Sequence, residues 1–83
     1  MDASVKRFFV DGRLTHVPKK QTAKHIVLEH VSKCFVKEKI YTEQEINHLL
    51  GEFIDDIPLL RRALVDYHYL TRTDDGRKYW VSN

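Results

Sequence analysis

Histidine and cysteine side chains are the first candidates for chemistry in this chain of 83 residues. His30 and Cys34 are four residues apart, a spacing at which one helix can supply two ligands to a zinc ion. Two more ligands would be needed, and the other histidines are scattered along the sequence, at His16, His25, His48 and His68. A single cysteine also excludes an internal disulfide and any multi-thiolate metal site. We therefore expect no metal and no other cofactor, and we expect Cys34 to be a buried core thiol.

The motifs of the common catalytic sites are absent from the sequence. Ser4, Ser32 and Ser82 lie in no nucleophile motif, and there is no glycine-rich loop that could hold a phosphate. The aspartate pairs Asp55–Asp56 and Asp74–Asp75 fit a helix cap and a turn better than a general acid and base. A chain of this length also leaves little room for a deep pocket. We expect neither an enzyme nor a small-molecule substrate.

Basic side chains are the remaining candidates, and they are distributed unevenly. Residues 1–37 carry eight Lys and Arg against three Asp and Glu (+5), residues 38–66 carry three against seven (−4), and residues 67–83 carry three against two (+1). The first part can attract phosphate, because phosphate binding releases counterions. The acidic middle excludes a uniformly basic surface, so charge alone does not identify the partner.

The pattern of residues 19–35 predicts the first helix. Apolar side chains recur there at spacings of three and four residues, at Ala23, Val27, Leu28, Val31, Cys34 and Phe35. Lys19 and Lys20 in the first turn are unfavourable for the helix dipole, which indicates a role other than helix stability. Before this helix, Asp11–Gly12 predicts a turn, and residues 13–17 alternate as a short extended segment would.

A capping box predicts a second helix over residues 42–53. Thr42 can accept a hydrogen bond from the amide of Glu45, whose carboxylate can reach back to the amide of Thr42. Residues 39–41 before it are expected to be briefly extended. A third helix is predicted over residues 57–67, with Asp55–Asp56 as its cap.

Two β-prone runs predict a C-terminal hairpin. Residues 69–72 and 77–81 flank Thr73–Gly76, whose Asp-Gly step favours a tight turn. The order of helix, short strand, helix, helix and hairpin is that of a winged helix-turn-helix. We therefore predict an α+β fold over residues 1–83 as a single domain, with three helices, a small antiparallel sheet and the hairpin as the wing. Tyr67 and Trp80 are expected to be core contacts.

Composition sets further bounds on the class of protein. The chain is 42% hydrophobic and 31% charged, which is typical of neither a disordered nor a membrane protein. No apolar run approaches the roughly 20 residues of a membrane span. Residues 1–4 include an acid directly after the first methionine and lack the pattern of a signal peptide. We expect a cytoplasmic protein that does not contact a membrane.

Four blocks of the sequence resemble a bacterial family, the domain of unknown function 2087. They are Lys6–Leu14, Tyr41–Asn47, Leu60–Tyr67 and Tyr79–Trp80. The resemblance implies a winged-helix domain that occurs alone or fused to the C-terminus of a helix-turn-helix transcriptional regulator, and it implies transcription-linked work without a defined catalytic site. One departure is His68, where the family commonly has glycine between the third helix and the wing.

The first expected function is binding to duplex DNA. In this hypothesis the third helix enters the major groove, and the hairpin and the start of the first helix contact the backbone. The candidate DNA-binding residues are Arg61, Arg62, Arg72, Arg77, Lys78, Lys19, Lys20 and Lys24.

The alternative is a protein-interaction module, or a homodimer, with no DNA binding of its own. A component of the transcription machinery would be one such partner, because a fold does not determine function. Acidic residues near the third helix favour this alternative, as would exposure of Phe8, Phe9 or Trp80. Arg61 and Arg62 decide between the two: free side chains favour DNA, and pairing with Asp55 or Asp66 favours a protein surface.

Overall fold

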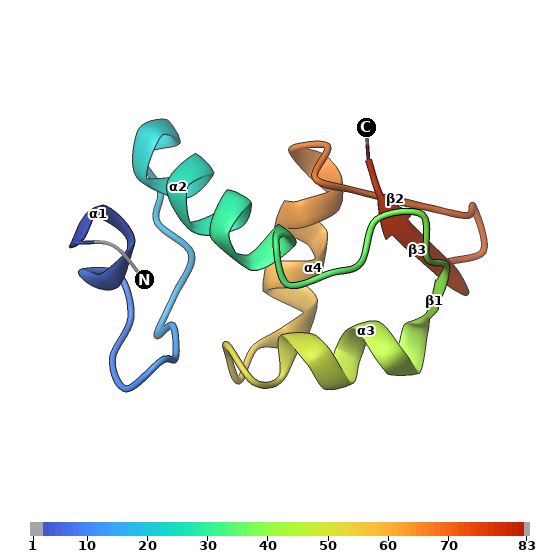
Figure 1. Cartoon of the computed structure of the whole chain (residues 1–83), viewed down its shortest axis with the longest axis horizontal. Helices are drawn as coiled ribbons and strands as arrows, with labels where there is room; N and C mark the ends of the chain where they lie inside the picture. The colour runs from blue at the N-terminus through green and yellow to red at the C-terminus, as the bar shows by residue number, and fades with distance from the viewer. Residues whose placement is uncertain (1–2, 83) are drawn as a thin grey trace.

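The computed structural model describes residues 3–82. Within this range the chain forms four helices and a three-stranded antiparallel sheet, which is an α+β arrangement (Figure 1). The elements are α1 (Ala3–Lys6), α2 (Gln21–Ser32), β1 (Tyr41–Thr42), α3 (Glu43–Leu50), α4 (Ile57–Asp66), β2 (Leu70–Arg72) and β3 (Lys78–Val81). The order from α2 onward is the predicted one, and α1 is an addition that the sequence analysis did not predict.

Two of the predictions concern a signal peptide at the N-terminus and membrane-spanning segments. The signal-peptide prediction falls partly on residues 1–2, which lie outside the described residues. No helix within residues 3–82 combines the length and the apolar character that crossing a bilayer requires.

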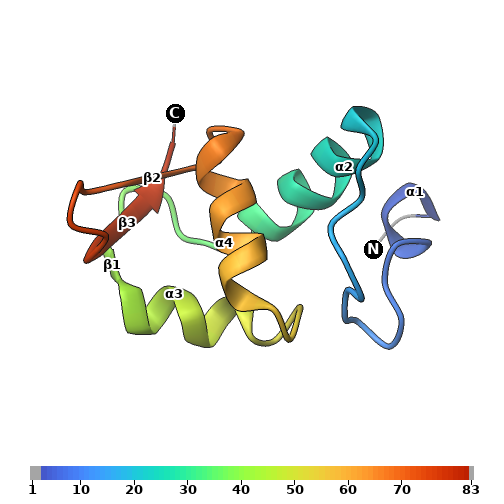
Figure 2. The same cartoon turned by 180° about the vertical axis from the view of Figure 1, so that it is seen from behind.

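Helix α4 lies at the centre of the molecule, with α2 on one side, the sheet on the other and α3 across its first turns (Figures 1 and 2). Its Leu60 and Leu64 are completely buried, and the helix contacts α2, α3 and β2. These two leucines belong to a core whose other members are Leu14, Val27, Leu28, Val31, Phe35, Tyr41, Ile46, Leu50, Ile54, Leu70 and Tyr79. Because the core occupies one side of α4, the opposite side is left to solvent.

The predicted capping box is confirmed at the start of α3. The amide of Glu45 donates to the Thr42 hydroxyl over 3.1 Å, and the amide of Thr42 donates to the Glu45 carboxylate over 2.9 Å. The hydrogen bond from the Thr42 amide is the largest cause that lowers the pKa of Glu45. The helix ends at Leu50, earlier than the predicted residue 53, and residues 51–56 connect it to α4.

The connection between α3 and α4 is held by the N-terminal segment. One Arg13 nitrogen donates to the carbonyl oxygen of Gly51 over 2.8 Å, and the other pairs with the carboxylate of Asp55. The amide of Leu14 donates to the carbonyl oxygen of Phe53. Residues far apart in the sequence thereby fix the angle at which α4 leaves α3.

The predicted hairpin is confirmed, and β1 joins its sheet in the order β1-β3-β2. Tyr79 on β3 lies opposite Tyr41 on β1 and Arg72 on β2. Because neighbouring residues of a strand face opposite sides of the sheet, Tyr79 enters the core and Trp80 lies on the outer side. Tyr79 is only 4% exposed, whereas Trp80 is half-buried outside the core. The prediction of Trp80 as a core contact was therefore wrong, while Tyr67 is half-buried against the core.

The helix predicted over residues 19–35 is shorter at both ends. Lys20 is the residue before the helix, with an extended ψ of 135° and no side-chain cap, and the helix ends at Ser32. Cys34 lies beyond the last helical turn, so it does not continue the apolar stripe, and its side chain is exposed. The prediction of a buried thiol was wrong. Partial desolvation and then the Glu52 carboxylate raise the pKa of this thiol.

The turn at Asp11–Gly12 is confirmed, but residues 13–17 do not form a strand. Both turn residues have positive φ angles, 52° and 79°, as a two-residue type I′ turn requires. The pairing across the turn stops at a single bridge between Val10 and Arg13, because the chain then turns away to contact the α3–α4 connection.

The C-terminus of α4 has the hydrogen bonds of a Schellman motif. The amide of His68 donates to Val65 over 3.1 Å, and the amide of Tyr69 donates to Leu64 over 2.8 Å. The motif places His68 at a φ of 65°, a left-handed conformation that glycine adopts most easily. His68 therefore occupies a position where a side chain is unfavourable.

We predict that Thr42→Ala lowers the free energy of unfolding by about 1 kcal/mol, because the N-cap hydroxyl is lost. Thr42→Ser retains the hydroxyl and should retain most of the stability. Urea denaturation followed by circular dichroism measures both variants. Equal stability of Thr42→Ala and the unmodified chain would contradict the capping role.

We predict that His68→Gly raises the free energy of unfolding by about 0.5 kcal/mol. Removal of the Cβ relieves roughly 1–2 kcal/mol of left-handed strain, and the greater freedom of glycine in the unfolded chain offsets roughly 0.5–1 kcal/mol of this gain. His68→Ala keeps the Cβ and should show no such gain in the same denaturation experiment. A gain in both variants would instead assign the effect to loss of the imidazole.

Candidate nucleic-acid interface

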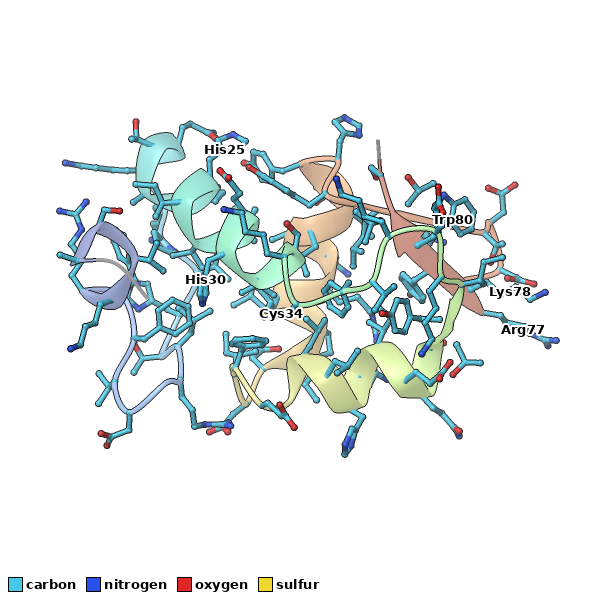
Figure 3. The ribbon with its side chains drawn as sticks, in the orientation of Figure 1. His25, His30, Cys34, Arg77, Lys78 and Trp80 are labelled. Atoms are coloured by element: carbon cyan, nitrogen blue, oxygen red, sulfur yellow. The ribbon has the colours of Figure 1, made fainter. Side chains whose placement is uncertain are left out.

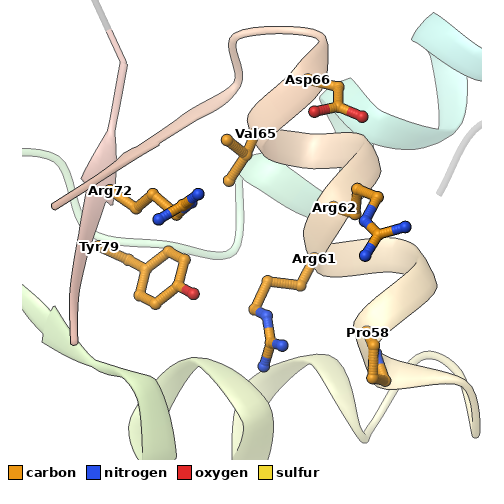
Figure 4. Close-up of a pocket in the computed structure, with 7 residues that line it drawn as sticks. All are labelled: Pro58, Arg61, Arg62, Val65, Asp66, Arg72 and Tyr79. Carbon is orange, nitrogen blue, oxygen red and sulfur yellow. The ribbon is translucent and has the colours of Figure 1, made fainter. Parts of the chain in front are cut away.

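A cleft of about 280 Å³ lies between the outer side of α4 and the hairpin (Figure 4). We call it the α4–hairpin cleft, and its lining residues are Pro58, Arg61, Arg62, Val65, Asp66, Arg72 and Tyr79. Three of these residues are arginines and one is an aspartate. The cleft is cationic because the apolar side of α4 is used by the core, which leaves its charged positions to line the cleft and its rim.

Arg61 connects α4 to α3. Its Nη1 donates to the Asn47 side-chain oxygen and lies 3.9 Å from the Glu43 carboxylate. The Arg61 side chain is only 23% exposed. We expected Arg61 to be either free or paired with Asp55 or Asp66; instead, it is held by two residues of the neighbouring helix.

The adjacent Arg62 is different. Arg62 is exposed, and its side chain makes no hydrogen bond or ion pair with any described residue. Successive residues of a helix point about 100° apart, so Arg61 faces α3 and Arg62 points outward. In Figure 4 Arg62 lies on the rim of the cleft with Asp66, on the side away from the hairpin.

Arg72 is oriented by the hairpin turn. Its Nη1 donates to the carbonyl oxygens of Thr73 and Asp74, over 2.9 and 3.2 Å. These bonds use one nitrogen of the guanidinium group, and the group lies beside Tyr79 in Figure 4. Arg72 is therefore placed in the cleft before any ligand binds.

Arg77 and Lys78 lie at the end of the hairpin, outside the cleft, and point away from the body of the molecule (Figure 3). Neither side chain has a hydrogen-bond or ion-pair partner among residues 3–82. The turn before them is ordered by Asp75, whose carboxylate accepts from the Thr73 hydroxyl and the Arg77 amide. These two bonds, the Thr73 bond first, lower the pKa of Asp75.

The three lysines at the start of α2 lie apart from the hairpin. Figures 1 and 2 both show the first turn of α2 and the sheet on opposite sides of α4. Lys19 and Lys20 are exposed. Lys24 donates to the Tyr67 hydroxyl over 2.9 Å and lies 4.6 Å from the centre of its ring. This bond, followed by one from Gln21, lowers the pKa of Tyr67. The eight predicted residues therefore form three groups: cleft, hairpin end and α2 start.

Tyr79 is the residue of the cleft that the sequence analysis missed. Its ring is buried, yet Figure 4 shows its hydroxyl pointing into the space between Arg61 and Arg72. No described residue forms a hydrogen bond with this hydroxyl, whose oxygen is open to the cleft rather than buried. The alternation along β3 was the available signal, because it allows only one of the adjacent Tyr79 and Trp80 to reach the α4 side.

His30 and Cys34, which were considered as zinc ligands, have different surroundings. The His30 ring packs edge-on against Phe9 and Phe53, with centroid distances of 5.4 and 6.5 Å. The Cys34 thiol donates a hydrogen bond to the backbone carbonyl oxygen of His30 over 3.8 Å. In the part of the chain that the structure describes, no three His, Cys, Asp or Glu side chains come together as a metal site would need.

The outer side of the sheet has a second, more apolar hollow of about 260 Å³. It is lined by Glu38, Ile40, Trp80 and Val81, and Ile40 is 60% exposed. Phe8 and Phe9, by contrast, are half-buried against the core. Of the three aromatic residues considered for a partner surface, Trp80 is the one that lines this hollow.

We predict that Arg61→Ala destabilises the protein by about 1 kcal/mol, because it leaves Asn47 and Glu43 without their partner. Arg62→Ala should change stability by less than about 0.5 kcal/mol, because the side chain is exposed and unpaired. Thermal and urea denaturation of the two variants measures this difference. Equal costs would contradict the different placements of the two arginines.

Sequence comparison identifies one family. Residues 13–81 match the family described as an uncharacterized protein conserved in bacteria, the domain of unknown function 2087. No curated protein and no solved structure gives a significant match. The match covers three of the four resembling blocks, and the first block, residues 6–14, lies mostly before it. The chain belongs to this bacterial family.

Proposed function

We propose that the protein binds duplex DNA through α4 and the hairpin, in a winged-helix arrangement. The connectivity supports this arrangement, because α2, β1, α3 and α4 are followed by a hairpin whose sheet includes β1. Helix α4 would be the helix that enters the major groove, and the hairpin would lie along the phosphate backbone.

The observation that carries the proposal is the placement of unpaired cations around the solvent side of α4. Arg62 on the helix and Arg77 and Lys78 on the hairpin have no partner among the described residues. Guanidinium groups can pair with guanine in the groove, and all three cations can neutralise phosphate. Arg61 has a positioning role, because its bonds to α3 fix the angle of α4.

The acidic residues near α4 oppose DNA binding less than the sequence alone indicates. Asp55 is paired with Arg13, and the carboxylate of Asp56 caps α4 through the amide of Leu59. Asp66 remains on the cleft rim, one helical turn from Arg62. Lys19 and Lys20 would contact the backbone at a distance from the hairpin, while Lys24 is held by Tyr67.

The test is a titration of the protein into mixed duplex DNA at two salt concentrations, with binding followed by fluorescence anisotropy. We expect affinity to fall steeply with salt, and we expect Lys78→Ala to reduce the log–log slope by about 1. Arg62→Ala should weaken binding at both salt concentrations.

The control is Lys37→Ala, which removes an exposed cation outside all three groups and should leave DNA affinity nearly unchanged. Equal losses in Lys37→Ala and Lys78→Ala would indicate attraction by net charge alone. Absence of binding at low salt would exclude the proposed function for this chain.

A second candidate function is protein binding at the outer side of the sheet. The hollow beside Trp80 and Ile40 favours it, because exposed apolar surface next to a half-buried tryptophan is typical of interaction sites. This surface lies on the other side of the sheet from Tyr79. A protein bound to this hollow would therefore not block DNA binding at α4.

A further inference from the structure

The α4–hairpin cleft is lined by three groups that can donate hydrogen bonds to an anion. Arg72 is held by the carbonyl oxygens of the turn, Arg61 is held by Asn47, and the Tyr79 hydroxyl lies between them (Figure 4). Each arginine uses Nη1 for its protein partners, and none of the bonds within residues 3–82 uses its other nitrogens. Donors therefore remain for a ligand.

Tyr79 is the more specific sign of a ligand. A side chain that is only 4% exposed places a polar hydroxyl in the cleft, and no described residue satisfies it. No buried side-chain oxygen within residues 3–82 lacks a partner, so the Tyr79 oxygen is the accessible tip of a buried ring and is free to donate to a ligand that enters the cleft. The turn closes one side: a Cβ at Gly76 would lie 3.8 Å from the Tyr79 oxygen and 3.9 Å from Arg72 Nη1.

We propose that this cleft binds one phosphate group, with Arg61, Arg72 and the Tyr79 hydroxyl as its donors. A tetrahedral anion can accept from two planar guanidinium groups and a hydroxyl at once, and charge-assisted bonds of this kind are the stronger class. Asp66 also lines the cleft and opposes an anion, but it lies on the rim beyond Arg62, away from Tyr79 and Arg72 (Figure 4). Glu43 offsets part of the Arg61 charge from the α3 side.

The phosphate group could be part of the DNA backbone or a free phosphate. A DNA phosphate in the cleft would extend the proposed function and rests on it. Binding of free phosphate does not depend on the proposed function. The first source also assigns distinct roles: Arg61 and Arg72 hold a backbone phosphate, while the unpaired Arg62 is left to contact the groove.

The first experiment titrates the ¹⁵N-labelled chain with sodium phosphate at constant ionic strength and follows the arginine Nε–H resonances by NMR. We expect saturable shifts at Arg61 and Arg72, and a Kd raised about tenfold in Tyr79→Phe, the loss typical of one hydrogen bond to a charged group. Tyr69→Phe is the matched control, because its hydroxyl bonds to His25 outside the cleft.

Arg72→Lys is a second variant, which keeps the charge but loses the planar pair of donors, and it should also weaken phosphate binding. Thermal melts confirm that each variant is folded. Linear shifts that do not saturate, or equal Kd values for the unmodified chain and both variants, would overturn the phosphate site.

The second experiment titrates the same variants with duplex DNA. Weaker duplex binding in Tyr79→Phe and Arg72→Lys, with competition by phosphate, supports the site and identifies the DNA backbone as the source. Saturable phosphate binding without duplex binding supports the site for free phosphate and refutes the proposed function. Duplex binding that is unchanged in both variants and indifferent to phosphate refutes the DNA backbone as the source and leaves the proposed function in place.

Discussion

The burial of Leu60 and Leu64 is the constraint on which the other features depend. Each buried leucine contributes about 1.5–3 kcal/mol, a large share of the roughly 5–15 kcal/mol that stabilises a typical domain. In a chain of 83 residues, these two side chains join α2, α3 and β2 in one core. Once they are buried, the rotation of α4 about its axis is fixed, and so is the set of residues that faces the hairpin.

That rotation separates two adjacent arginines into different environments. Arg61 is directed to α3, where Asn47 and Glu43 hold it, and Arg62 is directed to solvent. The first side chain is ordered at little further entropic cost when a ligand binds, and the second remains adaptable. A surface with both kinds of cation can position a phosphate backbone through the ordered Arg61. It can adjust to a nucleic-acid groove through the exposed Arg62.

Local sequence patterns predicted most of the helices and strands. Helix ends and the grouping of side chains in space depend on tertiary contacts, so the sequence patterns did not predict them. Thr42 and Glu45 lie within one helical turn, so the capping box could be predicted from the sequence. The end of α2 could not, because the apolar spacing continues to Cys34 after the helix has stopped at Ser32. The eight basic candidates could be named, but their division into three groups depends on the packing of α2 and the sheet around α4. The place of Tyr79 in the cleft was not predicted, because the neighbouring Trp80 was expected to be the core contact.

The two-residue strand β1 has a consequence beyond its size. A slip of β3 by one residue would exchange the sides of Tyr79 and Trp80, so that the indole would enter the core and the phenol would face outward. Pairing of Tyr41 with Tyr79, and the hydrogen bond from the Glu43 amide to Arg77, oppose this slip. So short a ladder adds little stability. Its effect is on surface chemistry: the alignment of two backbones determines whether the side of the molecule beside α4 presents a hydroxyl or a bare aromatic ring.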